Sequence, residues 1–195
     1  RKKLVTLKNI IKKYPNNINM VGYMMRFHPA MKIIKNILKK KSLGQIFHFN
    51  FMWGEYLPYW HKNENYKKSY AANKSMGGGA ALTLSHDLDL AKYLFGEVKQ
   101  VNIIKSKINS LKINAESAVD ILVEFRGNII GNIHLDYLQK KPTRKLNIYG
   151  TDGVLEFDYY KNELSINKLK SLKIKKFKKF KRNDLFVEEI KYFIS

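Results

Sequence analysis

A succession of short strand-like segments fills the second half of the chain, and this pattern constrains the fold more than any other feature of the sequence. From Val98 onward, β-branched and aromatic residues recur in short runs, separated by turn residues such as Arg126-Gly127-Asn128 and Thr151-Asp152-Gly153. The runs predict strands at residues 98–108, 118–125, 129–138, 145–149, 154–160 and 164–166. Because short turns join neighbouring strands in antiparallel pairs, we expect a largely antiparallel sheet.

The first half of the chain has a mostly helical pattern. Apolar residues at helical spacing predict one helix over residues 2–13 and another from Pro29 to the lysines before Gly44. Residues 80–95 predict a third helix, which follows three glycines, and the short apolar run 18–23 suits a buried strand. Helices followed by antiparallel strands indicate an α+β fold, with the helices on one face of an open sheet.

Three further segments carry expectations about packing. Residues 45–56 alternate with period two, so one face of this strand is expected to carry an aromatic row of Phe47, Phe49, Phe51 and Trp53. Residues 57–76 have no period and predict a long loop of the kind that covers a site. A last helix is expected to begin at Asn183 and to turn inward the side chains of Phe186, Ile190 and Phe193.

The charge balance raises the question of a polyanionic partner. The chain has 37 basic and 16 acidic residues, a net charge of +21, and the densest basic stretch is 168–182. Phe177 and Phe180 interleave with its lysines, which resembles a surface for stacking bases. No nucleic-acid motif accompanies them, and Leu172 and Ile174 alternate with lysines as on a solvated strand. We therefore keep nucleic acid as an alternative partner and do not expect it.

Composition also excludes several classes of protein and site. The chain has no cysteine, which removes disulfides and thiolate chemistry. No apolar stretch approaches the roughly 20 residues of a membrane span, and the N-terminal residues do not form a secretory signal. Paired histidines at metal-binding spacing are also missing, so we expect no metal site. These observations predict a cytoplasmic protein without a membrane partner.

Two features remain as candidates for chemistry. The glycines at 77–79 precede a helix, where backbone N–H groups can hold an anion, but they lack the dinucleotide and P-loop spacings, so a tight turn is the favoured interpretation. His86 stands among Ser85, Asp87 and Asp89, so a titratable imidazole lies beside groups that can orient it. From spacing alone, the favoured interpretation of His86 is a partly buried helix histidine bonded to a neighbouring carboxylate.

Several motifs, in order along almost the whole chain, resemble one family. They are VGYMMRFHPAMKIIKNILKKKSLGQI, GEYLPYW, YKKSYAANKSMGGGAALTLSHDLDLAKYLFGEV and HLDYLQKKPTRKLNIYGTDGVLEFD. Together they are similar to the C-terminal domain of the Gfo/Idh/MocA family of NAD(P)-dependent sugar oxidoreductases. The similarity is greatest to members associated with surface-polysaccharide and nonulosonic-acid gene clusters.

The resemblance implies a two-domain enzyme of which this chain is a piece. Residues 1–24 match the last helix and strand of a Rossmann domain, and residues 25–195 match a substrate-binding domain that is cut short at its end. NAD or NADP is the implied cofactor and needs the N-terminal half. A sugar or nucleotide-sugar is the implied substrate. The family also implies a homo-oligomer through the open sheet face, where an aromatic row would need a cover.

The resemblance also assigns roles to individual residues. His86 matches the histidine that moves a proton to or from the sugar hydroxyl, and Asp89 matches an acidic residue on the same helix. Counting forward from the glycines places Thr83 where relatives carry a carboxylate, and counting back from His86 places Leu82 there. Neither is acidic, so either His86 works with a lysine of the missing half or the chemistry is weakened. The other candidates are substrate contacts from Tyr56, Trp60, Tyr70, Asp136 and Tyr137, and a weak cofactor contact from Arg26.

Two hypotheses follow from these residues. The first is hydride transfer between NAD(P) and a hydroxyl or keto carbon of a sugar, with His86 as the acid/base. The second is a catalytically silent sugar-binding or assembly module, which the non-acidic Thr83 favours.

Overall fold

The computed structural model describes residues 2–195 and contains one open sheet. Its eight described strands lie in the order β2-β3-β4-β1-β5-β6-β7-β8. Their bounds are β1 Ile46–Gly54, β2 Val98–Ser106, β3 Ala118–Phe125, β4 Ile129–Asp136, β5 Thr143–Gly150, β6 Gly153–Asp158, β7 Glu163–Lys168 and β8 Ser171–Lys176. The strands predicted from residue 45 onward are therefore present, and β8 adds a further strand inside the basic stretch.

The pairing of these strands is antiparallel except at one place. Strand β1 lies parallel to β4 on one side and antiparallel to β5 on the other, with Phe51 opposite Ile133 and Leu146. This arrangement inserts the first strand of the chain into the middle of the later β meander. The prediction of an α+β fold with an open, mostly antiparallel sheet is confirmed.

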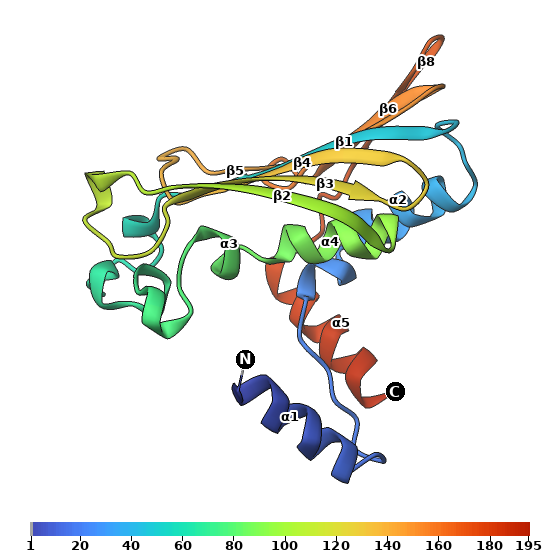
Figure 1. The fold of residues 1–195 in the computed structure, drawn as a ribbon. Helices are drawn as coiled ribbons and strands as arrows, with labels where there is room; N and C mark the ends of the chain where they lie inside the picture. The colour runs from blue at the N-terminus through green and yellow to red at the C-terminus, as the bar shows by residue number, and fades with distance from the viewer. Residues whose placement is uncertain (1) are drawn as a thin grey trace.

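Helices cover one face of the sheet (Figure 1). They are α1 Lys2–Lys13, α2 Pro29–Lys39, α3 Ala80–Thr83, α4 His86–Phe95 and α5 Arg182–Ile194, with short 3-10 turns at Met24–Phe27 and within the segment 57–76. Helices α2, α3 and α4 lie directly under the sheet, whereas α1 and α5 extend away from it. Among residues 2–195, no helix lies on the opposite face of the sheet.

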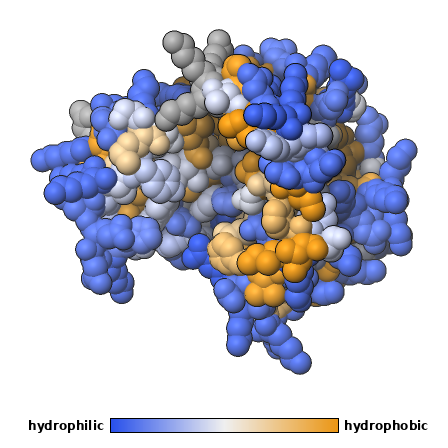
Figure 2. All heavy atoms as spheres, turned by 90° about the horizontal axis from the view of Figure 1, so that it is seen from below, coloured by the Kyte–Doolittle hydropathy of each residue, from blue (hydrophilic) through white to orange (hydrophobic). Residues whose placement is uncertain are grey.

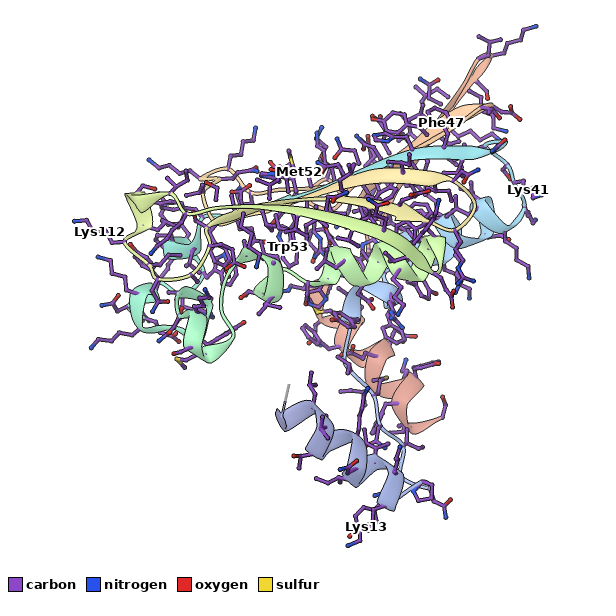
Figure 3. The ribbon with its side chains drawn as sticks, viewed as in Figure 1. Lys13, Lys41, Phe47, Met52, Trp53 and Lys112 are labelled. Carbon is purple, nitrogen blue, oxygen red and sulfur yellow. The ribbon has the colours of Figure 1, made fainter. Side chains whose placement is uncertain are left out.

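The aromatic row of β1 lies mainly in the core, although Phe47 at its start is 52% exposed. Phe49 and Phe51 are fully buried, and the Phe49 ring lies 4.7 Å from the Phe95 ring of α4. Figure 3 shows Trp53 pointing to the helix side of the sheet and Met52 to the open side. The expectation that this row covers an oligomer interface is therefore wrong. Period two defines two faces of a strand, and here the helices cover the aromatic one.

The helix predicted over residues 80–95 is interrupted. It divides into α3 and α4 at Leu84 and Ser85, where the buried Leu84 has φ −94° and ψ 27°. Serine competes for backbone hydrogen bonds and favours helix ends, which suits a break at this point. The break places His86 in the first turn of α4.

The buried strand predicted at residues 18–23 is also wrong. This segment is not a strand, and it links α1 to the rest of the molecule with its apolar side chains in solvent. Ile18 is 70% exposed and Val21 is 75% exposed. A short apolar run can be buried only where neighbouring strands receive it, and among residues 2–195 none lies beside this segment.

The last helix begins earlier and faces differently than predicted. Lys181 occupies the N-cap position, and its backbone N–H donates to the Asp184 carboxylate at 2.8 Å. Leu185 is the buried residue, whereas the predicted inward residues Phe186, Ile190 and Phe193 are 39–60% exposed. Figure 2, which views the molecule from the helix side, shows apolar side chains at the surface among the lysines.

Candidate functional site

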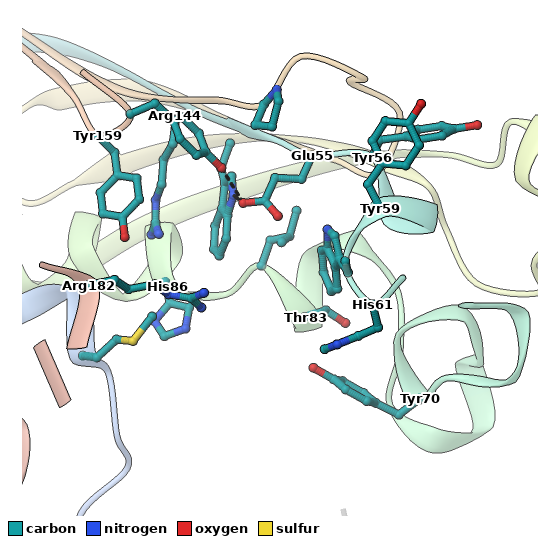
Figure 4. A pocket seen from close by; sticks show the side chains of 16 residues that line it. Glu55, Tyr56, Tyr59, His61, Tyr70, Thr83, His86, Arg144, Tyr159 and Arg182 are labelled. Atoms are coloured by element: carbon teal, nitrogen blue, oxygen red, sulfur yellow. Dashed lines mark hydrogen bonds between the residues drawn. The ribbon is translucent and has the colours of Figure 1, made fainter. Parts of the chain in front are cut away.

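A cavity of about 490 Å³ lies between the ends of β1 and β5, helices α3 and α4, and the first residue of α5 (Figure 4). The segment 57–76 closes one end of it. Five of the predicted site residues line this cavity together: Tyr56, Trp60, Tyr70, Thr83 and His86. The structure thus brings them to one place, and their individual roles stay predictions.

His86 presents a neutral imidazole to this cavity. Its ring lies edge-on to Tyr23, with ring centroids 5.5 Å apart, and 5.8 Å from the Trp53 ring. Burial, together with the positive charge of Arg144, lowers the pKa of His86 to about 4. The imidazole is therefore uncharged at neutral pH and can accept a proton.

Arg144, which lines the cavity, forms a buried ion pair with Asp87 of α4. The Arg144 Nε donates to Asp87 Oδ1 at 3.0 Å, Nη2 donates to the same oxygen, and both side chains are almost completely buried. Burial raises the pKa of the Asp87 carboxyl, and the guanidinium opposes that rise. The Arg144 guanidinium also lies 3.8 Å from the centre of the Trp53 ring, so it fixes one aromatic wall of the cavity.

Glu55 follows β1 and places a carboxylate at the cavity. Its Oε1 accepts hydrogen bonds from Trp53 Nε1 at 2.9 Å and from the Tyr160 hydroxyl at 2.6 Å. Burial and the bond to Glu55 both raise the pKa of Tyr160, so the phenol stays protonated and acts as the donor. These two donors hold the carboxylate in one orientation.

Three buried polar atoms in the cavity wall lack a hydrogen-bond partner among the described residues. They are Trp60 Nε1, Thr83 Oγ1 and His86 Nδ1. Buried polar groups in folded proteins are nearly always satisfied, by protein, water or ligand. These buried atoms belong to three side chains that line the cavity, so a ligand with hydroxyl groups that reached them would satisfy them.

The other predicted site residues do not line this cavity. Asp136 accepts from the backbone N–H of Leu138 at 2.7 Å and lies 3.0 Å from His134 Nε2. Tyr137 is fully buried and packs its ring 5.5 Å from Trp60, so it supports the wall from behind. Arg26 donates through Nε to Asp89 Oδ2 at 2.7 Å and joins the turn Met24–Phe27 to α4.

The glycines before α3 do not form a phosphate cradle. A Cβ at Gly78 would lie 2.1 Å from the Tyr70 carbonyl oxygen, and one at Gly79 would lie 2.4 Å from the Glu116 carboxylate. Both positions are filled by the chain itself, so these residues are glycines because of close packing. Gly78 and Gly79 therefore do not form a dinucleotide-binding turn.

Two further classes of site find no support in the described part of the chain. Residues 2–195 contain no group of three or more His, Asp or Glu side chains that could hold a metal ion. Phe177 and Phe180 pack their rings against the buried His28, at 5.5 Å and 4.3 Å, and are therefore not presented as a platform for bases. None of the described helices is long and apolar enough to cross a membrane.

Comparison with known proteins gives the family. Residues 31–156 match the model of the GFO/IDH/MocA C-terminal domain, which is more than half of the chain. The chain belongs to the Gfo/Idh/MocA family.

Individual relatives of this Gfo/Idh/MocA chain are distant. Levoglucosan dehydrogenase of Pseudarthrobacter phenanthrenivorans is 23% identical over 76% of this chain and 44% of its own length. The solved complex of levoglucosan dehydrogenase with NADH and levoglucosan has a TM-score of 0.70 at 22% identity, covering 82% of this chain and 47% of that one. An inositol dehydrogenase homologue from Azotobacter vinelandii, complexed with NAD⁺, has a TM-score of 0.76 at 14% identity, covering 90% and 47%. The chain spans about half the length of the relatives it matches.

Three residues that line the cavity of this Gfo/Idh/MocA domain were not predicted from the sequence. Glu55 stands in the quoted motif GEYLPYW and could have been found as an acid directly after a strand. Arg144 gave no signal, because its partner Asp87 is 57 residues away. Arg182 also lines the cavity and adds a positive charge that lowers the pKa of His86, but in the sequence it is one basic residue among many.

Proposed function

We propose that this chain is the sugar-binding domain of an NAD(P)-dependent sugar or nucleotide-sugar oxidoreductase, with His86 as the acid/base. The neutral imidazole of His86 in a cavity walled by aromatic rings is the observation that supports it most. Aromatic faces suit sugar rings, and the unsatisfied Thr83 and Trp60 atoms suit sugar hydroxyls. Relatives solved with NADH or NAD⁺ support the choice of cofactor.

The chemistry that this chain supplies is the movement of one proton. During oxidation His86 takes the proton of the reacting hydroxyl, and during reduction it returns that proton. A pKa below neutrality keeps the imidazole in its basic form at the start of oxidation. The hydride acceptor would be held outside the described residues, and the role of this chain is therefore to bind the sugar and to handle its proton.

The division of the chain is part of the same proposal. Residues 1–24 would be the end of a dinucleotide-binding domain and residues 25–195 the substrate domain. The exposed apolar residues of α1 support this division, because Leu4, Leu7 and Ile10 are each more than half exposed and have an apolar face to bury. Oligomerisation would use the open sheet face, where Met52, Leu122 and Ile130 are exposed instead of the aromatic row.

Tryptophan fluorescence offers a direct test of sugar binding. The chain has two tryptophans, Trp53 and Trp60, and both line the cavity. Titration with levoglucosan or myo-inositol should therefore change the emission saturably, and cyclohexanol at the same concentrations should not. A response to neither polyol would contradict the proposed function.

A catalytically silent sugar-binding module is the second candidate. The observation that favours it is Thr83, which cannot carry the negative charge that relatives place there. Both candidates predict saturable binding of a sugar. They differ in turnover, because the silent module should show no NAD(P)-dependent conversion of any sugar that it binds.

A further inference from the structure

The cavity contains one carboxylate, that of Glu55, among the described residues. It does not come from α3, the helix that follows the glycines. It comes from the end of β1, across the cavity from Thr83 and His86 (Figure 4). Asp87 is on the helix but lies behind the wall, where Arg144 uses its Oδ1.

The position of the Glu55 carboxylate is set before any ligand arrives. Its backbone N–H donates to the Asp136 carbonyl at 3.1 Å, which ties the residue to the end of β4. Trp53, which donates to Oε1, is itself held under the Arg144 guanidinium. A side chain fixed in this way loses little conformational freedom on binding.

The two donors leave one oxygen of the Glu55 carboxylate, Oε2, available for a hydrogen bond. Trp53 Nε1 and the Tyr160 hydroxyl both bond to Oε1, and no described residue donates to Oε2. An ionised carboxylate only accepts hydrogen bonds, so the group that completes this site must be a donor. Sugar hydroxyls are donors, and a hydrogen bond to a charged acceptor is stronger than one between neutral groups.

We propose that Glu55 Oε2 accepts a hydrogen bond from a ring hydroxyl of the substrate and so supplies the carboxylate that position 83 lacks. This inference rests on the proposed function. Glu55 holds the ring from the β1 side, while His86 faces it from α4. The site should therefore select substrates that carry a hydroxyl at the position facing Glu55, because an analogue without it leaves a buried acceptor unpaired.

The test combines one substitution with single-hydroxyl deletions in the ligand. Native chain and Glu55→Gln are titrated with levoglucosan and with analogues that each lack one hydroxyl, and binding is followed by tryptophan fluorescence. Glu55→Gln should weaken levoglucosan binding about tenfold or more. The analogue that lacks the hydroxyl facing Glu55 should bind the native chain about tenfold more weakly than levoglucosan does. This analogue and levoglucosan should bind Glu55→Gln with equal affinity.

Two further variants control the experiment. Glu156→Gln removes an exposed carboxylate from β6 and should leave every affinity unchanged. Tyr160→Phe removes one of the two donors on Oε1 and keeps the carboxylate, so it should weaken binding about threefold and preserve the preference among analogues. If Glu55→Gln does not fold, the test rests on Tyr160→Phe. Unchanged levoglucosan binding by that variant then contradicts the inference.

The outcomes separate the inference from the proposed function. If Glu55→Gln binds all the ligands as the native chain does, Glu55 does not contact the substrate, and the proposed function is unaffected. A uniform loss of affinity for every analogue, without a change in preference, assigns Glu55 a structural role only and overturns the inference. If the native chain binds neither levoglucosan nor myo-inositol, the proposed function fails and the inference fails with it.

Discussion

The Arg144 guanidinium lies 3.8 Å from the centre of the Trp53 ring while it pairs with the buried Asp87. One side chain of β5 thus connects a ring of β1 to the start of α4. Trp53 in turn donates to Glu55, and His86 immediately precedes Asp87 in the first turn of α4. The shape of the cavity therefore depends on a buried charge pair, one member of which, Arg144, also lines the cavity.

Breaking this pair should destabilise the fold. Arg144→Gln leaves Asp87 buried without its cation, and the expected loss is about 3 kcal/mol of unfolding free energy. Urea denaturation followed by circular dichroism measures this loss, with Arg126→Gln as the control because Arg126 forms an exposed ion pair with Glu97. A loss below about 1 kcal/mol would show that the pair contributes little.

Stability should decrease on the acid side because two histidines stay neutral in the fold. Burial lowers the pKa of His28 and of His86 to about 4, below the ordinary value of 6.5. Between these values the unfolded chain binds more protons than the folded one, so the free energy of unfolding falls as pH falls. Each histidine should account for about 2 kcal/mol between pH 7 and pH 5.

Urea denaturation at several pH values tests this expectation. His86→Gln should lose about 2 kcal/mol less than the native chain over that interval. His61→Gln, which alters an exposed histidine, should follow the native chain. If the free energy of unfolding falls equally with pH in His86→Gln and in the native chain, His86 is charged in the folded state.

His134 should have the opposite effect on the alkaline side. It lies between Asp120 at 2.9 Å and Asp136 at 3.0 Å, and hydrogen bonds to these carboxylates raise its pKa to about 9. Its stabilisation is therefore fully present below pH 6.5 and is lost as pH rises through 9. With allowance for its partial exposure, we expect a loss of about 2 kcal/mol between pH 6 and pH 9.

The matched variant for this prediction is His134→Gln. It should be less stable than the native chain at pH 6 and should lack the decline towards pH 9. His48→Gln, on the same open face of the sheet, serves as the control and should retain the decline. If the stability of His134→Gln declines as much as that of the native chain towards pH 9, a group other than His134 causes the decline.

The local patterns of the sequence predicted the strands well, because alternation and turn residues act over a few neighbouring positions. They did not decide which face of β1 is covered, since that depends on where α4 packs. They also gave residues 18–23 to a strand and Phe186 to the core, although each of these needs a neighbour that the described residues do not provide.

The residues of the candidate site also fall into two groups, those that local motifs predict and those that only the fold brings together. His86 and the aromatic residues came from motifs whose members lie close together in the sequence. Arg144 and Asp87 are 57 residues apart, and Glu55 and Tyr160 are 105 residues apart, so only the folded sheet brings them together. Thr83 lines the cavity from α3, and the acidic side chain among the described lining residues, Glu55, follows β1 and lies far from Thr83 in the sequence.

The most direct test of the account is the turnover of the enzyme that joins this domain to its dinucleotide-binding half, with and without His86. NAD(P)-dependent oxidation of the sugar that binds best should be measured for native enzyme and His86→Ala. We expect kcat to fall about 10²-fold or more, with KM changed only a few-fold, because the variant can bind the sugar but cannot take its proton. A His86→Ala enzyme with native kcat would contradict the central claim that this imidazole is the acid/base.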